Sequence, residues 1–145
     1  MEVAILPEPF DPWAELVAYQ ARRTELAGQF GATAVFVGTM RDMNEGQGVE
    51  TMTLEHYPGM TERQLHAILD EAAGQWPLLD ALVMHRVGAM CPADPIVLVA
   101  VWSAHRGAAF DASRHIMEAL KSRAPFWKKE SGVAGERWVE KNTPG

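Results

Sequence analysis

The sequence predicts an α+β fold, in which helices pack on a mixed or antiparallel sheet. Three stretches have the apolar spacing of amphipathic helices, and pairs of short β-branched segments stand between and after them. The expected order is α-β-β-α-β-β-α-β-β, unlike the strict alternation of a doubly wound fold. With 145 residues, no repeat and no long linker, we expect a single domain over 1–145.

Three helices are expected from their start and stop signals. Asp11 is a good N-cap residue, and the proline after it suits the first helical position. Thr61 and Gln64 have the spacing of a capping box, and Pro125 stops the last helix. The expected helices cover 11–27, 61–76 and 107–123. The residues expected to face the core are Trp13, Leu16, Val17 and Ala21 in the first helix, Leu65, Ile68, Leu69 and Ala72 in the second, and Phe110, Ile116, Met117 and Leu120 in the third.

Six strands are expected from runs of β-branched and aromatic residues. The segment 41–48 is polar and contains two glycines, so we expect a flexible loop there. The expected strands cover 32–40, 49–56, 81–87, 96–104, 126–130 and 137–140.

Composition excludes several classes of protein. Cys91 is the one cysteine, so neither an intrachain disulfide nor a cysteine-rich zinc site can form. The longest apolar run has seven residues, far below the roughly 18 that span a bilayer. The first residues carry acids and prolines where a signal peptide has basic and then apolar residues. We therefore expect a cytoplasmic protein that does not enter a membrane.

Charge is distributed unevenly along the chain, whose formal net charge is −6. Residues 1–80 carry thirteen acids and four arginines, whereas residues 81–145 carry nine basic and six acidic residues. An acidic protein that gathers its cations in one stretch is expected to hold a small anion rather than nucleic acid. A solvated helix face that balances acids elsewhere would give the same composition.

Arginines follow two of the expected strands. Arg41 follows the first strand, and His105-Arg106 stands between a strand and a helix. Backbone N–H groups and a guanidinium at such a corner suit an oxyanion or a phosphate. An arginine that merely caps the sheet edge is the alternative.

Lysines gather at the end of the third helix and in the strand after it. Lys121 stands in the last helical turn, where a cation meets the helix dipole favourably. Lys128 and Lys129 point to opposite faces of a strand, so at most one of them enters a given pocket. A lysine crowded by cations and aromatic walls has a lowered pKa and can act as a base or nucleophile. Lysines that merely flank a tryptophan on the surface are the alternative.

Motifs of other chemistries are absent from the sequence. It has no GxGxxG, no Walker loop and no HExxH, and its five histidines show no i, i+4 pairing. We therefore expect no metal. Cys91 has no basic neighbour within three positions to lower its thiol pKa, so we expect a bystander.

Five segments together resemble the large, catalytic subunit of molybdopterin synthase. They occur in the family's order over about residues 30–140, and the last two carry most of the specificity. The segments are GATAVFVGTMRD (31–42), LEHYPGM (54–60), HRVG (85–88), SAHRGAAF (103–110) and LKSRAPFWKKE (120–130).

This resemblance implies an α/β-hammerhead fold and a sulfurtransferase activity that needs no cofactor. Members convert cyclic pyranopterin monophosphate, called precursor Z, into molybdopterin by installing two sulfurs as a dithiolene. The sulfur arrives as a thiocarboxylate on the C-terminal Gly-Gly of a small ubiquitin-like sulfur-carrier subunit. Members form a central homodimer with one carrier at each end, which makes a heterotetramer. Because Cys91 lies outside the matched segments, we expect the sulfur to come from the partner.

The resemblance also implies which residues form the site. The family's key lysines fall on Lys121 and Lys128, and Lys121 is expected to be the more critical because a helix holds it more rigidly. The His-Arg pair can reach the pocket from the neighbouring protomer in this family. The substrate-contacting positions are Thr39, Met40, Arg41, His105, Arg106, Lys121, Lys128, Lys129 and Glu130.

The residue types agree with the implied chemistry. Arg41, His105 and Arg106 supply charge-assisted donors for a cyclic phosphate. The two lysines can stabilise negative charge and transfer protons. Two positions depart from the family pattern: Met40 replaces a smaller β-branched residue, and Lys129 stands where arginine also occurs. Neither departure removes a required charge.

Two other classes of function compete with this interpretation. A non-catalytic dimer that only docks a ubiquitin-like protein would not need Lys121 or Lys128. A nucleotide or RNA binder could use Phe126 and Trp127 with the nearby cations, but the acidic first half of the chain disfavours it.

Overall fold

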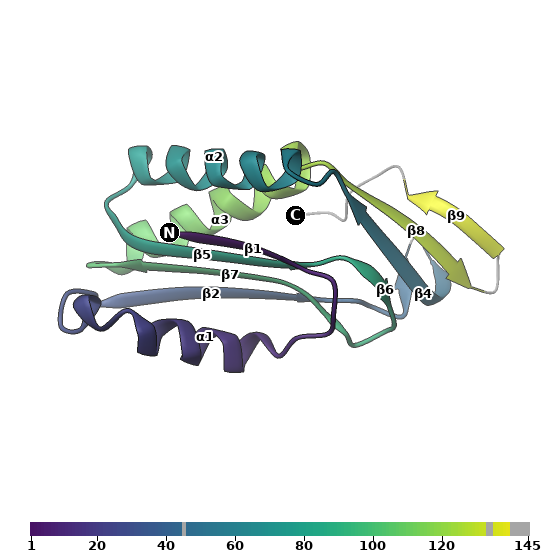
Figure 1. The fold of residues 1–145 in the computed structure, drawn as a ribbon, viewed down its shortest axis with the longest axis horizontal. Coiled ribbons are helices and arrows are strands. Elements are labelled where there is room, and N and C mark those ends of the chain that lie inside the picture. Colours follow the sequence, from purple (N-terminus) through teal and green to yellow (C-terminus); the bar gives the residue numbers. More distant parts are fainter. Residues whose placement is uncertain (45, 133–134, 140–145) are drawn as a thin grey trace.

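The structure is a computed structural model that describes residues 1–44, 46–132 and 135–139 (Figure 1). Its elements are, in order, β1 (Glu2–Leu6), α1 (Pro12–Arg22), a short 3-10 helix (Thr24–Leu26), β2 (Ala32–Thr39), β3 (Met43–Asn44), β4 (Gln47–His56), α2 (Met60–Gln75), β5 (Leu78–Arg86), β6 (Gly88–Met90), β7 (Pro95–Ser103), α3 (Arg106–Arg123), β8 (Phe126–Gly132) and β9 (Gly135–Val139).

A four-stranded sheet in the order β1-β5-β7-β2 forms the larger layer. β1 runs parallel to β5, and the other neighbours are antiparallel. Helices α2 and α3 cover one face and α1 covers the other (Figure 1). Successive residues of β7 therefore enter different cores: Val99 packs under α2 and α3, and Leu98 packs toward α1. This arrangement explains why β7 is apolar along its whole length.

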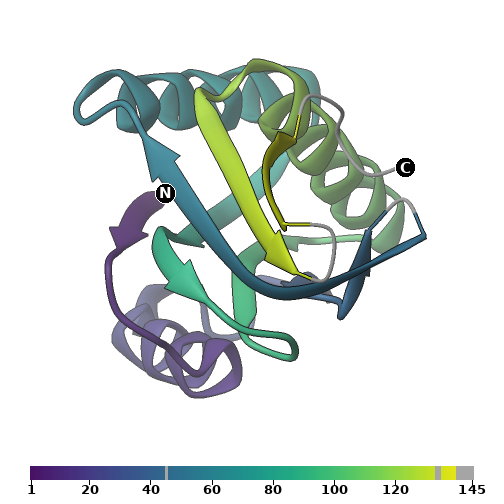
Figure 2. The same ribbon diagram turned by 90° about the vertical axis from the view of Figure 1, so that its right-hand side faces the viewer.

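A second, antiparallel sheet lies at one end of the first, with its strands inclined to it (Figures 1 and 2). Its order is β3-β4-β8-β9, and β6 also pairs with β4. The two sheets share a third core cluster, which contains Met40, the residue after β2, and Leu54 from β4. A bulge between Val49 and Thr51 brings Val49 into the same cluster. The α+β class, with three helices and mixed and antiparallel pairing, is confirmed.

Three strands were not expected from the sequence. β1 and β6 are short, and each forms only by pairing with a distant strand. β3 pairs with the start of β4, so residues 43–44 and 47–48 form a hairpin where a flexible loop was expected over 41–48. The last expected strand, 137–140, corresponds to β9, and position 140 lies outside the described residues.

The expected inward face of α1 is correct for Leu16, which packs against the core, and wrong for Trp13, Val17 and Ala21, which are exposed. Trp13 is 58% exposed and Val17 is 70% exposed, whereas Tyr19 is buried. Two contacts turn Tyr19 inward: its hydroxyl donates a hydrogen bond to buried Asp80 at 2.8 Å, and its ring packs against Trp102. The helix start is as expected, because the Asp11 side chain accepts from the N–H groups of the first turn.

The expected capping box of α2 is also wrong. The helix begins one residue earlier, at Met60, and Gly59 is its N-cap with a φ of 83°. Glu62 accepts from the Gly59 N–H at 3.2 Å, whereas Thr61 donates to the carbonyl of Pro125 and ties α2 to the start of β8. The apolar faces of α2 and α3 are buried as expected, except for Phe110, which is 66% exposed.

Candidate functional site

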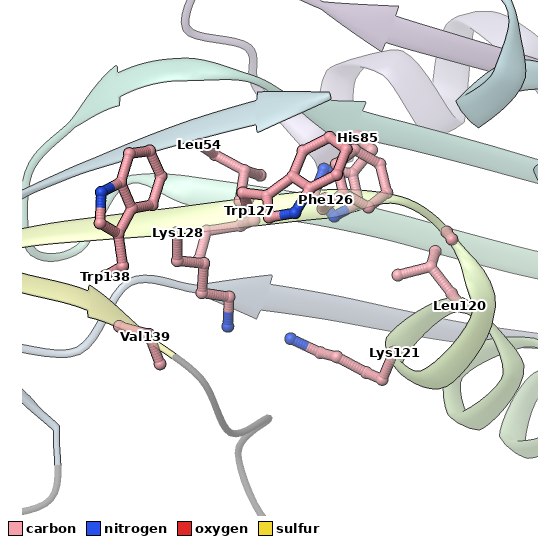
Figure 3. A pocket seen from close by; sticks show the side chains of 11 residues that line it. Leu54, His85, Leu120, Lys121, Phe126, Trp127, Lys128, Trp138 and Val139 are labelled. Atoms are coloured by element: carbon pink, nitrogen blue, oxygen red, sulfur yellow. The ribbon is translucent and has the colours of Figure 1, made fainter. Parts of the chain in front are cut away.

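A pocket of about 430 Å³ opens where the end of α3 meets β8 and β9 (Figure 3). Most of its wall is apolar, and two ammonium groups enter it. The lining residues are Leu54, His85, Ile96, Leu120, Lys121, Ala124, Phe126, Trp127, Lys128, Trp138 and Val139.

Lys121 and Lys128 reach this pocket from different elements. Lys121 stands in the last turn of α3, where the helix dipole favours a cation. Lys128 lies on β8 between its sheet partners Leu54 and Val139. Their amino groups point toward one another across the pocket (Figure 3). The alternation of β8 directs Lys129 elsewhere: it forms an ion pair with Glu136 at 3.2 Å.

The surroundings of Lys121 change its acidity. Burial, followed by the positive charge of Lys128 and a hydrogen bond with it, lowers the Lys121 pKa to about 8. An amine with such a pKa is mostly protonated at neutral pH and can still give up its proton. This is the condition for a group that acts as both acid and base.

His85 forms part of the pocket wall. Its ring stacks on Phe126 with 4.0 Å between centroids. Its Nδ1 lies 2.9 Å from the backbone carbonyl of Arg86. A carbonyl only accepts, so Nδ1 carries the proton and Nε2 does not. Burial, opposed by that hydrogen bond and reinforced by the charges of Lys121 and Lys128, lowers the His85 pKa to about 3. The ring therefore adds no third charge to the pocket.

Glu130 lies two residues beyond Lys128 but does not line the pocket. Its buried carboxylate forms an ion pair with Arg137 at 3.2 Å, across the β8–β9 pair. The structure therefore places Glu130 and Lys129 beside the lysine pocket rather than inside it.

β2 ends at Thr39, and Met40 and Arg41 follow it directly. Met40 is buried in the cluster that contains Leu54, and Leu54 also lines the pocket. Arg41, the next residue, is exposed. Thr39, Met40 and Arg41 are not among the residues that line the lysine pocket.

His105 and Arg106 lie at the opposite end of α3 from Lys121. The fifteen positions from 106 to 121 span about 22 Å of helix. Within one chain, therefore, the structure does not bring the His-Arg pair to the two lysines.

The first turn of α3 has an unusual composition. His105 occupies its N-cap without a side-chain cap, and the first turn, all of it within the described residues, contains no acid. Arg106 even places a cation where the helix dipole is positive. This arrangement suits the binding of an external anion.

A second groove, of about 620 Å³, lies on the surface between β2 and α3. Lys121 belongs to both hollows, because it lines this groove as well as the first pocket. The exposed apolar residues Val35, Phe36 and Phe110 line its wall. This groove was not expected from the sequence, because the helical spacing of Phe110 predicted that it would face the core.

His85 and Trp138 were also missed as pocket residues. His85 stands in the HRVG segment that carried the resemblance, but no role was inferred for it. Trp138 enters the wall only because β9 folds back on β8. Within the described ranges, no group of three or more possible metal ligands is found, and no helix is long and apolar enough to cross a membrane.

Comparison with known proteins gives a consistent result. The family model described as MoaE protein matches residues 7–123. The molybdopterin synthase catalytic subunit of Ralstonia nicotianae is 57% identical over 131 residues, which cover 90% of this chain and 72% of the relative.

Solved structures share the fold. The MoaE protein from Burkholderia ambifaria has a TM-score of 0.79 at 44% identity, covering 100% of this chain and 93% of its own. Molybdopterin synthase from Staphylococcus aureus has a TM-score of 0.82 at 33% identity, covering 95% and 96%. A complex of subunits 1 and 2 of molybdopterin-converting factor from Helicobacter pylori has a TM-score of 0.79 at 20% identity, covering 97% and 92%, and supports the fold alone.

Proposed function

The chain belongs to the MoaE protein family of molybdopterin synthase catalytic subunits, which are sulfur-transferring enzymes, and we propose how its own residues divide the work. The substrate is cyclic pyranopterin monophosphate, and the sulfur comes from the thiocarboxylated Gly-Gly end of a small ubiquitin-like subunit. The observation that carries this proposal is the pair of amino groups, Lys121 and Lys128, facing one another in a pocket with mostly apolar walls.

The lysine pair suits the end of a thiocarboxylated tail. A thiocarboxylate is an anion, and the pocket brings two ammonium groups together between mostly apolar walls. Lys121 and Lys128 stabilise the negative charge that develops when the sulfur, already bonded to a substrate carbon, leaves the acyl carbon as a thiolate and a water oxygen replaces it there to give a carboxylate. Lys121, with its pKa of about 8, also exchanges a proton with the reacting groups. Glycines allow the tail to enter because they present no side chains to Phe126 and its neighbours.

The phosphate of the substrate requires a second set of donors. Arg41 follows the end of β2, whereas His105 and Arg106 lie about 22 Å from Lys121 along α3. We place the His-Arg pair in the site of a second protomer. Thr39, Met40, Lys129 and Glu130 shape the surroundings of the same site.

Two-fold symmetry can bring these ends together. In a symmetric dimer, if residue 106 of one copy meets residue 121 of the other, the reverse contact also forms. Two α3 helices that run antiparallel and cross near positions 113–114 satisfy this condition. The exposed Phe110 and Phe36 line the groove on that face of α3, and their apolar surface suits an interface between protomers.

The remaining expectations follow from the family. A homodimer with a carrier at each end makes a heterotetramer, and the Helicobacter pylori relative was itself solved as a complex of two subunits. A cytoplasmic location and a single domain over 1–145 stay predictions.

Reconstitution tests the activity. The purified chain is incubated with a thiocarboxylated carrier and precursor Z, and molybdopterin is measured. We expect product with wild-type protein and background levels with Lys121→Ala. If the wild-type chain bound the carrier but formed no product, it would be a docking module rather than an enzyme.

Mixing two impaired variants tests the shared site, with turnover measured at a precursor Z concentration well below KM, where both variants are slow. Dimers of Lys121→Ala and dimers of Arg106→Ala are dissociated, mixed and allowed to reassociate. A mixed dimer then contains one site with both residues intact, so random pairing returns about a quarter of the wild-type sites. Each site would remain within one chain if mixing restored no activity.

A further inference from the structure

The turn between β6 and β7 holds the end of β2. The Met40 N–H donates to the carbonyl of Asp94 at 2.9 Å, and the Ala93 N–H donates to the carbonyl of Met40 at 2.8 Å. These two bonds lie beyond the point where the β2–β7 register shifts, between Gly38 and Thr39. The turn is therefore what continues the backbone pairing of β2 up to the residue before Arg41.

Asp94 shapes this turn. Its Oδ2 accepts from the Cys91 N–H at 2.9 Å, and its own N–H donates to the Cys91 carbonyl at 3.0 Å. Both bonds close the four-residue turn 91–94. Ala93, inside it, has a φ of 76°, which a residue with a Cβ adopts only when its surroundings enforce it.

Arg86 supports Asp94 from the interior. Its buried guanidinium donates to the Ala89 carbonyl at 2.7 Å and lies 3.9 Å from the Asp94 carboxylate. Its Nε and Nη1 make no hydrogen bond among the described residues. Asp94 is therefore the carboxylate that faces a buried and incompletely satisfied cation, which fixes it on that side of the turn.

We propose that Asp94 is the positioning residue for Arg41. This inference rests on the proposed role of Arg41 in binding the substrate phosphate. Asp94 does not touch the substrate; it holds the turn that fixes Met40 and thereby the point from which the exposed Arg41 side chain extends. Replacing Asp94 keeps the Arg41 guanidinium but allows the backbone at the end of β2 to move.

A double-mutant cycle tests the proposal. In reconstituted complex, Asp94→Ala is expected to raise KM for precursor Z about fivefold, the change expected from losing one or two hydrogen bonds, with kcat and carrier affinity nearly unchanged. Arg41→Ala is expected to raise KM more. In the Arg41→Ala background, Asp94→Ala should add little, because the guanidinium that it positions is gone.

Two further variants separate positioning from general stability. Tyr19→Phe removes the hydrogen bond between α1 and Asp80, which is not part of the turn 91–94. This variant should lower the stability of the fold without changing KM. Ala93→Gly allows the positive φ and should leave KM unchanged, whereas Ala93→Val opposes it and should raise KM. If Asp94→Ala does not fold, the two Ala93 variants carry the same test.

The outcomes distinguish the inference from the function on which it rests. An unchanged KM in Arg41→Ala would overturn the role of Arg41 in substrate binding. A raised KM in Arg41→Ala, with Asp94→Ala unchanged or fully additive to it, would overturn only the positioning role of Asp94.

Discussion

The two ends of α3 carry cations in opposite circumstances. At the C-terminal end, Lys121 is partly buried and the helix dipole favours its charge. At the N-terminal end, Arg106 is exposed, the dipole opposes it, and His105 supplies no side-chain cap. Helix stability accounts for the first cation and not for the second, which is why the N-terminal pair points to an external ligand.

The largest effect is expected at the C-terminal end. Lys121→Ala removes charge stabilisation at the reacting group and should lower kcat at least 100-fold in reconstituted assays. Arg123→Ala, two positions away, removes only an exposed ion pair with Glu71 and should retain near wild-type turnover. Comparable losses in both variants would mean that general positive charge matters, not the pocket. A smaller loss in Lys128→Ala would support the rigidity of Lys121 as the reason for its importance.

Arg106→Ala probes the N-terminal end and should act on binding. Losing a charge-assisted contact with phosphate is expected to raise KM for precursor Z about 10-fold or more, with little change in kcat. Arg22→Ala, on the surface of α1, is the matched control. A kcat defect without a KM change in Arg106→Ala would move this residue from substrate binding to the chemical step.

The pH dependence of folding stability should show how much burying the charged Lys121 side chain destabilises the folded state. The folded pKa of about 8 lies below the ordinary value of 10.5, so the protonated form is disfavoured in the folded state. That penalty is fully present below pH 8 and is relieved as the pH rises from 8 toward 10.5. Lys121→Met should therefore raise Tm at pH 7 by about 3 °C or more, and by less at pH 10. A gain independent of pH would trace instead to packing.

The smallest effect is expected from repairing the N-terminal end. His105→Asp adds the missing cap and an acid near the positive end of the dipole, and should stabilise the fold by about 1 kcal/mol in urea titrations. The same change should raise KM, because the new carboxylate repels the phosphate. His105→Asn adds the cap without the charge and separates the two effects. Stabilisation with unchanged KM would remove His105 from the substrate site.

Local signals predicted most of the fold. The apolar face of α2 was correct because Leu65, Ile68 and Leu69 repeat with helical spacing and nothing competes for them. The face of α1 was correct only at Leu16, because Tyr19 turns inward to donate a hydrogen bond to the buried carboxylate of Asp80, a contact that exists only in the folded chain. β1 and β6 were missed for the same reason: three to five residues form a strand only when a distant partner is present.

The site divides in the same way. The resemblance brought Lys121 and Lys128 together, and the structure places them on opposite sides of one pocket. The distance between Arg106 and Lys121 could be predicted from the sequence, because one continuous helix joins them and its rise per residue sets that distance. His85 was missed because a neutral ring in a pocket wall leaves no charge pattern in the sequence.

The facing amines of Lys121 and Lys128 also mean that the positive charges of the pocket are in place before an anion binds. Their mutual repulsion is imposed when the chain folds, by the end of a helix and the pairing of a strand, and it exists before any ligand arrives. An incoming anion relieves that repulsion instead of having to assemble the charges. If sulfur transfer takes place between these lysines, as proposed, little side-chain reorganisation is left for the reacting step, and the pocket is electrostatically preorganised for the charge that develops.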